Sequence, residues 1–485
     1  MADRTADSSR ERPELSKTLG PFGFFALAFG SIIGVGWLTA IGSWLDAAGP
    51  LGAIFAFVAG GLVMLLIGLC YAELTPMLPV AGGEVAYSYK AFGTLEAFLV
   101  GWLLTFGYIS VSAFEAVSIG KVLSFMFPGL DRGLLYRVDG DPVYLSHLAL
   151  ATVFTALITA LNYRGVAWAA AFQKWLVAAF IAATFVFIGA GFIGGELENM
   201  RPLMAGGSEL SVPGGMLAVF VTVPFWFVGF DTIPQGAEEA EVSLDPRKLG
   251  LLILTAIVGS TLFYVTLIMS VSLIAPWQTI TAADLPTARA FEAAFQSSLW
   301  VQLVLFAAML GLFTSWNGFF LAGSRVLFSM GRGRIIAPAF GATHPVYRTP
   351  HRAVLFIGAF TLLAPLLGGD ALLAFVNAGS FCIGAAFLGV SLSTIRLRRK
   401  FPGAVRPYRI RGGLTIPYLA VAGALFILAV MVIPGSPAAL AWPRELLILM
   451  IVVTSGALFW FGARGIRCDT PERERAYLIL EDYAD

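Results

Sequence analysis

Charged residues leave twelve long apolar stretches in this 485-residue chain. Each stretch has at least 17 consecutive residues without Asp, Glu, Lys or Arg. A helix needs about 20 apolar residues to cross a bilayer's hydrocarbon, and a charge at its middle costs about 2.5–3.5 kcal/mol. The pattern therefore predicts twelve membrane-spanning helices, at residues 21–45, 47–72, 97–114, 142–163, 175–195, 210–230, 249–283, 293–324, 353–369, 371–395, 412–443 and 446–463.

Two of these stretches contain residues that interrupt helices. Residues 30–36 hold three glycines, and residues 229–236 hold two glycines, a proline and Asp231. Both residue types weaken a helix interior, and unpaired backbone groups inside a bilayer are tolerated only beside protein or a water-filled cavity. Close packing of glycine-rich helices is the alternative explanation. Two interruptions in matching positions favour a pair of broken helices around a polar pocket.

Each interruption opens a group of five predicted helices. If residues 21–200 and 201–400 use one five-helix unit twice, the odd number of spans inverts the second copy. Residues 401–463 then supply two further helices outside the repeat. The charged segments 1–20 and 464–485 are expected to be tails with little order.

Composition supports a membrane protein and excludes other classes. Hydrophobic residues make up 58% of the chain, charged residues 13%, and the mean hydropathy is +0.82. Disordered, collagen-like and coiled-coil chains need polar or repetitive sequence. Three cysteines are too few for a disulfide framework or a zinc site. A net charge of +1 without a basic domain argues against nucleic acid as a partner.

Positive charge is concentrated on one side of the predicted topology. Of the 31 lysine and arginine residues, 25 fall in alternate loops and the two tails, and the strongest group is residues 396–400. The positive-inside rule places that side in the cytoplasm. We therefore expect a multi-pass protein of the plasma or inner cell membrane, with both termini cytoplasmic.

A pair of broken helices offers binding groups for a small zwitterion. Free N–H groups at the start of a half-helix suit a carboxylate, while exposed carbonyls suit an amine or a cation. Gly34 and Gly36 allow a ligand to approach the main chain closely, and the aromatic residues of 225–230 can cover an apolar side chain. The predicted partners are thus a small-molecule substrate and the lipid bilayer, in an oligomeric state that the sequence does not define.

Five segments, in the right order, resemble the amino acid permeases of the amino acid–polyamine–organocation superfamily. They are GSIIGVGWLTAIGSWLDAAGPLG (30–52), YAELTPMLPVAGGEVAYSYKAFG (71–93), FWFVGFDTIPQGAEEAEVSLDPRKLG (225–250), SRVLFSMGRGR (324–334) and RRKFPGAVRPYRIRGG (398–413). The resemblance covers residues 18–465. It implies an all-α, leucine-transporter-type fold with a five-plus-five inverted repeat, broken helices 1 and 6, and two extra helices. It also implies secondary active transport by alternating access, driven by an ion gradient or by exchange.

The resemblance also assigns candidate site residues. In such permeases the substrate carboxylate meets helix 1 amides and the amine meets carbonyls of both breaks. An inner aromatic gate lies four residues before the helix 6 glycine, which makes it Phe225 here. The implied substrate-binding residues are Ser31, Ile32, Ile33, Gly34, Val35, Gly36, Gly229, Phe230, Asp231, Thr232 and Ile233.

The coupling ion is left open between sodium and a proton, and no other cofactor or metal is expected. Several proton-coupled relatives carry a lysine partway along helix 5, where the spacing from Gly165 places Phe180 here. Sodium-dependent members of the fold use helix 8 hydroxyls that face helix 1. Thr314 and Ser315 are the candidates for that role, although helical hydroxyls more often bond to their own helix.

Several acidic residues need an explanation at membrane depth. Asp231 either binds the amine, titrates during coupling, or caps the following half-helix. Glu115 is either solvated near the outer face or points inward, where it favours an amine or cationic substrate. Glu238 and Glu239 are expected to pair with arginines at the cytoplasmic end of helix 6.

Other functional classes fit the sequence less well. HExxH, GxSxG and helical Asp-pair motifs are absent, which argues against an enzyme. A P-loop is also absent, so ATP is not the direct energy source. Paired breaks favour a transporter over a channel. A permease for an amine, polyamine or other small organic cation remains the alternative to an amino acid permease.

Overall fold

The computed structural model describes residues 12–138, 140–206, 211–369 and 371–484. In chain order the α-helices are α1 (Pro21–Ile32), α2 (Gly36–Thr39), α3 (Ile41–Met77), α4 (Gly83–Ala91), α5 (Thr94–Met126), α6 (Leu145–Arg164), α7 (Val166–Gly194), α8 (Val212–Val221), α9 (Val223–Phe227), α10 (Thr232–Gln235), α11 (Pro246–Ile274), α12 (Pro286–Phe295), α13 (Ser298–Arg332), α14 (His351–Leu363), α15 (Ala371–Lys400), α16 (Thr415–Val432), α17 (Arg444–Gly462), α18 (Arg464–Asp469) and α19 (Glu472–Leu480). Two strands, β1 (Leu134–Val138) and β2 (Asp141–Tyr144), form an antiparallel hairpin.

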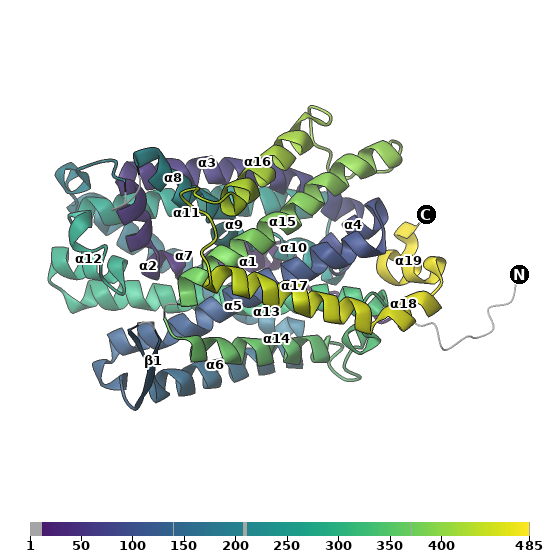
Figure 1. Cartoon of the computed structure of the whole chain (residues 1–485), viewed down its shortest axis with the longest axis horizontal. Coiled ribbons are helices and arrows are strands. Elements are labelled where there is room, and N and C mark those ends of the chain that lie inside the picture. Colours follow the sequence, from purple (N-terminus) through teal and green to yellow (C-terminus); the bar gives the residue numbers. More distant parts are fainter. Residues whose placement is uncertain (1–11, 139, 207–210, 370, 485) are drawn as a thin grey trace, which may run out of the picture.

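The long helices run side by side along the longest axis of the molecule (Figure 1). Ten of the described helical segments are long and apolar enough to cross a membrane. Two shorter apolar segments, Val212–Val221 and His351–Leu367, fall in the remaining two predicted spans. The prediction of twelve spans is thus matched by ten full-length candidates and two short ones.

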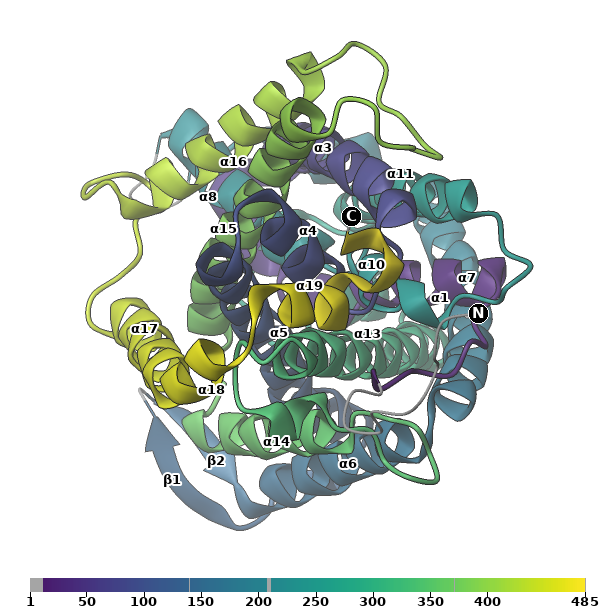
Figure 2. The same ribbon diagram turned by 90° about the vertical axis from the view of Figure 1, so that its right-hand side faces the viewer.

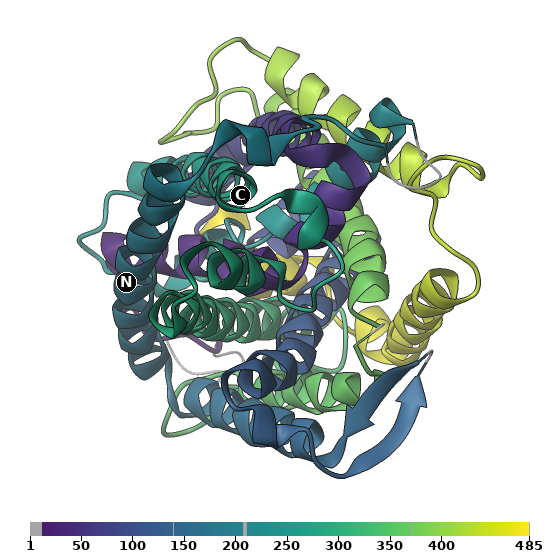
Figure 3. The same ribbon diagram turned by 90° about the vertical axis from the view of Figure 1, so that its left-hand side faces the viewer.

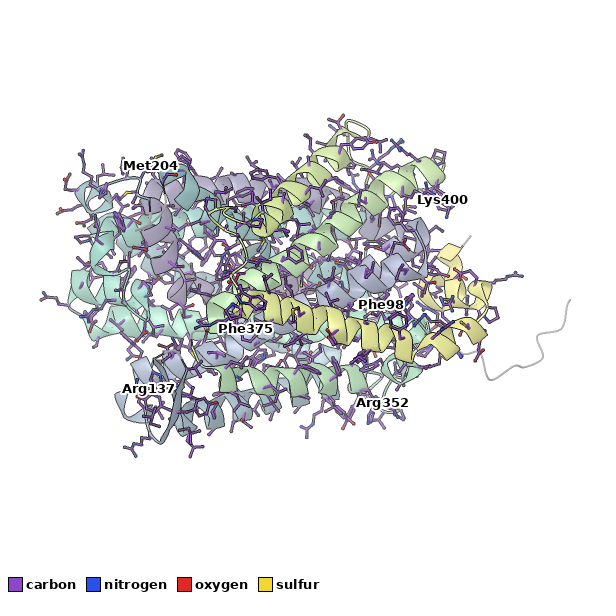
Figure 4. All side chains as sticks on the ribbon, in the orientation of Figure 1. Phe98, Arg137, Met204, Arg352, Phe375 and Lys400 are labelled. Carbon is purple, nitrogen blue, oxygen red and sulfur yellow. The ribbon has the colours of Figure 1, made fainter. Side chains whose placement is uncertain are left out.

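Both ends of the described chain lie at one end of this bundle. Arg12 forms an ion pair with Glu481, with Nη1 and Oε2 2.8 Å apart. The β hairpin lies at the opposite end of the bundle, at its edge (Figures 1 and 3). Lys400 and Arg352 lie toward the same end as the termini, whereas Arg137 of the hairpin lies at the other (Figure 4).

Both interruptions predicted from the sequence are present, with one shift in position. Helix 1 stops at Ile32 and resumes at Gly36 as α2. The second break covers residues 228–231, between α9 and α10, so it lies about a turn earlier than the predicted segment 229–236. Pro234 falls inside the first turn of α10, where its missing N–H removes no helical hydrogen bond.

The boundary between the first two spans differs from the prediction. The charged Asp46 was expected to separate them, but the chain stays helical through it. The bend occurs at Gly49, whose φ of 68° is left-handed, directly before Pro50. Glycine adopts that conformation without strain, and proline resumes a helix because it needs no N–H partner. One exposed carboxylate at a helix surface does not end a helix.

The expectation of little order in the tails was wrong for the residues described. The C-terminal segment forms α18 and α19, and α19 crosses the end of the bundle in contact with α13 and α4 (Figure 2). Ile479 and Leu480 are buried there. On the N-terminal side, Leu15 and Leu19 are buried as well. Apolar side chains in otherwise charged segments therefore anchor both tails; residues 1–11 lie outside the described part.

Candidate functional site

The two helix breaks touch each other near Gly229. This residue has a φ of 129°, and a Cβ placed on it would lie 2.5 Å from the Ile32 nitrogen and 2.8 Å from the Ser31 carbonyl carbon. Only a residue without a side chain permits both the backbone angle and this approach. The helix 6 break therefore packs directly against the end of α1.

A tyrosine of α11 connects the same two breaks. The Tyr264 hydroxyl lies 3.2 Å from the Ile32 carbonyl oxygen and 3.1 Å from the Trp226 carbonyl oxygen. The last carbonyls of a helix have no partner within it, and the single proton of this hydroxyl is shared between the ends of α1 and α9. The sequence analysis missed Tyr264, which gives no signal of its own within an apolar helix.

The helix 1 break exposes main-chain donors next to a buried acid. Among the described residues, the N–H groups of Gly34 and Gly36 have no hydrogen-bond partner. The Val35 N–H donates to Glu115 Oε1 at 3.4 Å. Glu115 is 1% exposed, and its Oε2 has no hydrogen-bond partner within the described part of the chain. Of the two alternatives for Glu115, the inward orientation is therefore correct and the solvated one is wrong.

A small closed cavity lies between the breaks. Its space for water is only about 10 Å³, roughly one molecule. Five aromatic side chains line it, and the Phe225 ring centroid lies 5.7 Å from that of Phe114 and 5.1 Å from that of Trp226. The lining residues are Ser31, Ile32, Gly34, Gly36, Val111, Phe114, Glu115, Phe225, Trp226, Tyr264, Ser315 and Phe319.

The other predicted helix 6 residues do not line this cavity. Phe230 packs against Tyr71 and Phe387, each with a ring-centroid distance of 5.2 Å. The Thr232 hydroxyl donates to the Gly229 carbonyl within the turn, and Ile233 is fully buried. On helix 1, Ile33 and Val35 lie in the break, but their side chains are not part of the lining.

Asp231 stabilises the break without capping α10, which excludes the cap among the three alternatives for this residue. Its Oδ1 accepts a hydrogen bond from the Gly229 N–H at 2.7 Å, and its Oδ2 accepts one from the Tyr108 hydroxyl at 2.8 Å. Gln235 continues the contact, because its amide donates to Tyr108 and to Glu84 of α4. The carboxylate therefore contacts α5 directly and is connected to α4 through Gln235. It does not line the cavity.

The residues proposed for ion coupling fall in different places. Ser315 lines the cavity, whereas the Thr314 hydroxyl donates to the Gly311 carbonyl of its own helix at 2.9 Å. Phe180, at the position where relatives carry a lysine, packs on Trp37 and Phe263. Among the described residues, no group of three or more His, Cys, Asp or Glu side chains could hold a metal ion.

Comparison with known proteins identifies the family. The family model described as amino acid permease matches residues 19–457, which is most of the chain. The chain belongs to the amino acid permease family. It is therefore a transporter rather than an enzyme.

Relatives of this permease carry several kinds of solute. It is 30% identical over 436 residues to the branched-chain amino acid permease BcaP of Bacillus subtilis, covering 88% of this chain and 90% of the relative. It is 26% identical to the methylthioribose transporter of the same organism, with 86% and 88% covered. It is 28% identical to the glutamate/serine transporter AimA, also from that organism, with 92% and 82% covered.

On the side of the β hairpin, an open recess reaches toward the permease's closed cavity. The recess has a volume of about 480 Å³, and its charged lining includes Asp46, Lys121 and Asp284. Phe114 lines both the recess and the cavity. The Phe114 side chain therefore lies at the boundary between the cavity and this recess.

On the opposite side, buried ion pairs seal the permease. Glu239 pairs with Arg325 at 2.7 Å, and Glu238 pairs with Arg332 at 2.8 Å and with Arg12 at 2.9 Å. The predicted pairing of both glutamates with arginines is thus confirmed. Burial alone would raise the pKa of the Glu238 carboxyl, but the Arg332 and Arg12 guanidinium groups lower that pKa to about 2.

Proposed function

We propose that this permease moves an amino acid across the cell membrane by alternating access around the two helix breaks. An ion gradient or exchange drives the movement. The proposal includes twelve spans in a five-plus-five inverted repeat, with both termini in the cytoplasm. The observation that carries it is the pair of free N–H groups, Gly34 and Gly36, at a cavity enclosed by both breaks.

The chemistry of the cavity supports a substrate with a carboxylate, an amine and an apolar side chain. Free main-chain N–H groups suit the carboxylate, and the unpartnered Glu115 Oε2 suits the amine. Ile32, Val111, Phe114 and Phe319 supply apolar walls. The space of about 10 Å³ is too small for such a solute, so Phe225 and Trp226 have to move to admit it, as expected of a gate.

An amine or small organic cation is the second candidate substrate. The observation that favours it is Glu115, a buried acid inside the cavity without a matching basic side chain in the lining. A buried charge needs a partner, and a cationic substrate would provide one.

Uptake into proteoliposomes distinguishes the two candidates. Purified permease is reconstituted and supplied with a labelled panel of amino acids and of amines, with either an ion gradient or an internal unlabelled solute. We expect uptake of at least one aliphatic amino acid. Uptake of amines alone would replace the first candidate with the second, and uptake of neither would contradict both.

Glycine substitutions test whether the break is the binding site. A Cβ at Gly36 would lie 2.2 Å from Trp226 Cζ3, and one at Gly34 would lie 1.9 Å from Glu115 Oε1. Gly34→Val and Gly36→Val should therefore abolish uptake while the protein still inserts. Gly189→Val is the control, because a Cβ on this α7 glycine meets nothing within 4 Å. Normal transport by the first two variants would remove the proposed site.

A further inference from the structure

Three buried amide side chains connect α6, α7 and α13 behind the helix 1 break. Asn162 Nδ2 donates to Asn317 Oδ1 at 2.9 Å, and Asn317 Nδ2 donates to Gln173 Oε1 at 2.9 Å. These side chains belong to residues that are at most 3% exposed. The chain of amides ends at Gln173, which faces α1.

Gln173 joins α1 to α13 through main-chain carbonyls. Its Nε2 donates to the Thr314 carbonyl at 2.9 Å and to the Ala26 carbonyl at 3.3 Å. Carbonyl oxygens only accept hydrogen bonds, so the NH₂ group has to face them while Oε1 faces Asn317. All of these groups are satisfied without any charge.

This junction does not fit a sodium ion. Sodium would need the oxygens that face α1 and α13, but the Gln173 NH₂ group already points its hydrogens at two of them. The Thr314 hydroxyl donates to its own helix. The space is also filled, because a Cβ on Gly30 would lie 2.7 Å from Gln173 Nε2 and 2.5 Å from Val177 Cγ2. The neutral amide occupies the position that a bridging cation would need.

We propose that Gln173 is a positioning residue whose amide holds α1 against α13, so that transport by this permease does not require sodium. The inference rests on the proposed alternating access, in which one group of helices moves against the other. Because the link carries no charge, neither sodium nor a proton has to bind there before α1 is held in place.

Sodium replacement tests the first part of the proposal. Uptake is measured in proteoliposomes with sodium or with choline at equal ionic strength, and we expect equal rates. A requirement for sodium would overturn the inference but leave the proposed function intact. If no solute is taken up at all, the proposed function fails. The thermal unfolding midpoint of the purified permease in the two salts then still decides the sodium question, with a sodium-dependent shift contradicting the proposal.

Gln173→Glu tests the role of the amide itself. The variant keeps the shape of the side chain but places a carboxylate against two carbonyls, an arrangement that needs a proton or a cation. We expect its uptake to rise with added sodium or as the pH falls. Gln278→Glu is the matched control, since this exposed amide also donates to a main-chain carbonyl, that of Arg201, at 2.9 Å. Wild-type behaviour of Gln173→Glu under all conditions would refute the positioning role.

Gln173→Leu provides a second variant if Gln173→Glu does not fold. It removes both donors to the Ala26 and Thr314 carbonyls and takes the Oε1 acceptor away from the buried Asn317 amide, so it should slow uptake about tenfold, with no recovery on adding sodium. Size-exclusion chromatography verifies that the protein is intact. Unchanged uptake by a well-folded Gln173→Leu would count against the proposal.

Discussion

Glu115 combines burial, a long hydrogen bond from the Val35 N–H, the Ser315 hydroxyl as a neighbour, and a place in the cavity wall. Its Oε1 accepts from Val35 at 3.4 Å, and its Oε2 has no partner among the described residues. A buried carboxylate that accepts few hydrogen bonds is costly. We therefore expect Glu115 to accept a hydrogen bond from a donor group of the substrate. Glu115 is thus the side chain that best distinguishes a transporter of zwitterions or amines from a transporter of anions.

Glu115→Gln tests this role. The variant still accepts the Val35 N–H but removes the negative charge, so we expect the affinity for an amine-bearing substrate to fall at least tenfold, or about 1.5–3 kcal/mol. Binding of a labelled substrate to purified protein measures it. Glu96→Gln is the control, because Glu96 lies exposed in the first turn of the same helix, α5. Equal affinity for both variants and the wild type would show that Glu115 does not contact the amine.

The sequence identifies some site residues and conceals others. Gly34 and Gly36 could be selected because glycine is the residue that lets a ligand approach a main chain closely. Tyr264 and Gln173 could not be selected. Each is a polar residue in an apolar helix whose partners are main-chain carbonyls of helices distant in the sequence. Pairing of this kind depends on how the helices pack, which a local pattern does not contain.

At the scale of elements, the helix 6 break depends on one backbone angle. Gly229 has a φ of 129°, and the carboxylate of Asp231 accepts from its N–H. The chain can therefore leave α9, turn, and enter α10 while the turn rests on α1. Both oxygens of the Asp231 carboxylate accept hydrogen bonds from protein groups, the Gly229 N–H and the Tyr108 hydroxyl.

Gly229→Ala is expected to destabilise the permease and abolish uptake. Both the left-handed angle and a contact of 2.5 Å with the Ile32 nitrogen oppose the new methyl group. Gly435→Ala separates the two effects, because Gly435 also has a positive φ of 82° but a Cβ there meets nothing within 4 Å. The control should lose only the cost of the backbone angle, about 1–2 kcal/mol of unfolding free energy. Equal thermal unfolding midpoints for the two variants would mean that the contact with α1 is unimportant.

Elements were predicted well where the pattern is long and poorly where tertiary contacts decide. Runs without charge give the long helices, and glycine with proline gives the breaks. The same rules placed a boundary at Asp46, although a charge at a helix surface is compatible with helix. They also missed α19, whose sequence is mostly charged, because Ile479 and Leu480 become buried only when the bundle offers them a surface.

At the scale of the whole molecule, the two sides of the cavity are closed by different forces. Toward the hairpin side, Phe114 lies between the recess and the cavity, with its ring against those of Phe225 and Trp226. Toward the side of the termini there are buried ion pairs that join α13, the end of helix 6 and the N-terminal segment. Removing one partner of a buried pair costs about 3–5 kcal/mol, because the other charge is left uncompensated.

Glu238→Gln should therefore weaken this seal substantially. Arg332 loses its charged partner, Arg12 keeps only Glu481, and the unfolding free energy should fall by about 3 kcal/mol. Since the pKa of Glu238 is lowered to about 2 in the folded protein, its contribution is present above its ordinary pKa. That contribution disappears only as the pH falls toward 2.

Thermal unfolding at pH 5 and pH 7 checks both statements. The difference between wild type and Glu238→Gln should be the same at the two pH values. Glu14→Gln, an exposed residue of the same tail, serves as the control. A deficit that vanished at pH 5 would show that Glu238 titrates in the ordinary range and is not held by the arginines.

The shared position of Phe114 in the recess and the cavity has a pharmacological consequence. A blocker that enters from the hairpin side meets aromatic side chains, which can rotate away. A blocker that enters from the opposite side has to separate buried ion pairs. Inhibition should accordingly set in faster from the hairpin face, and compounds with a flat hydrophobic head would be the natural starting chemotype.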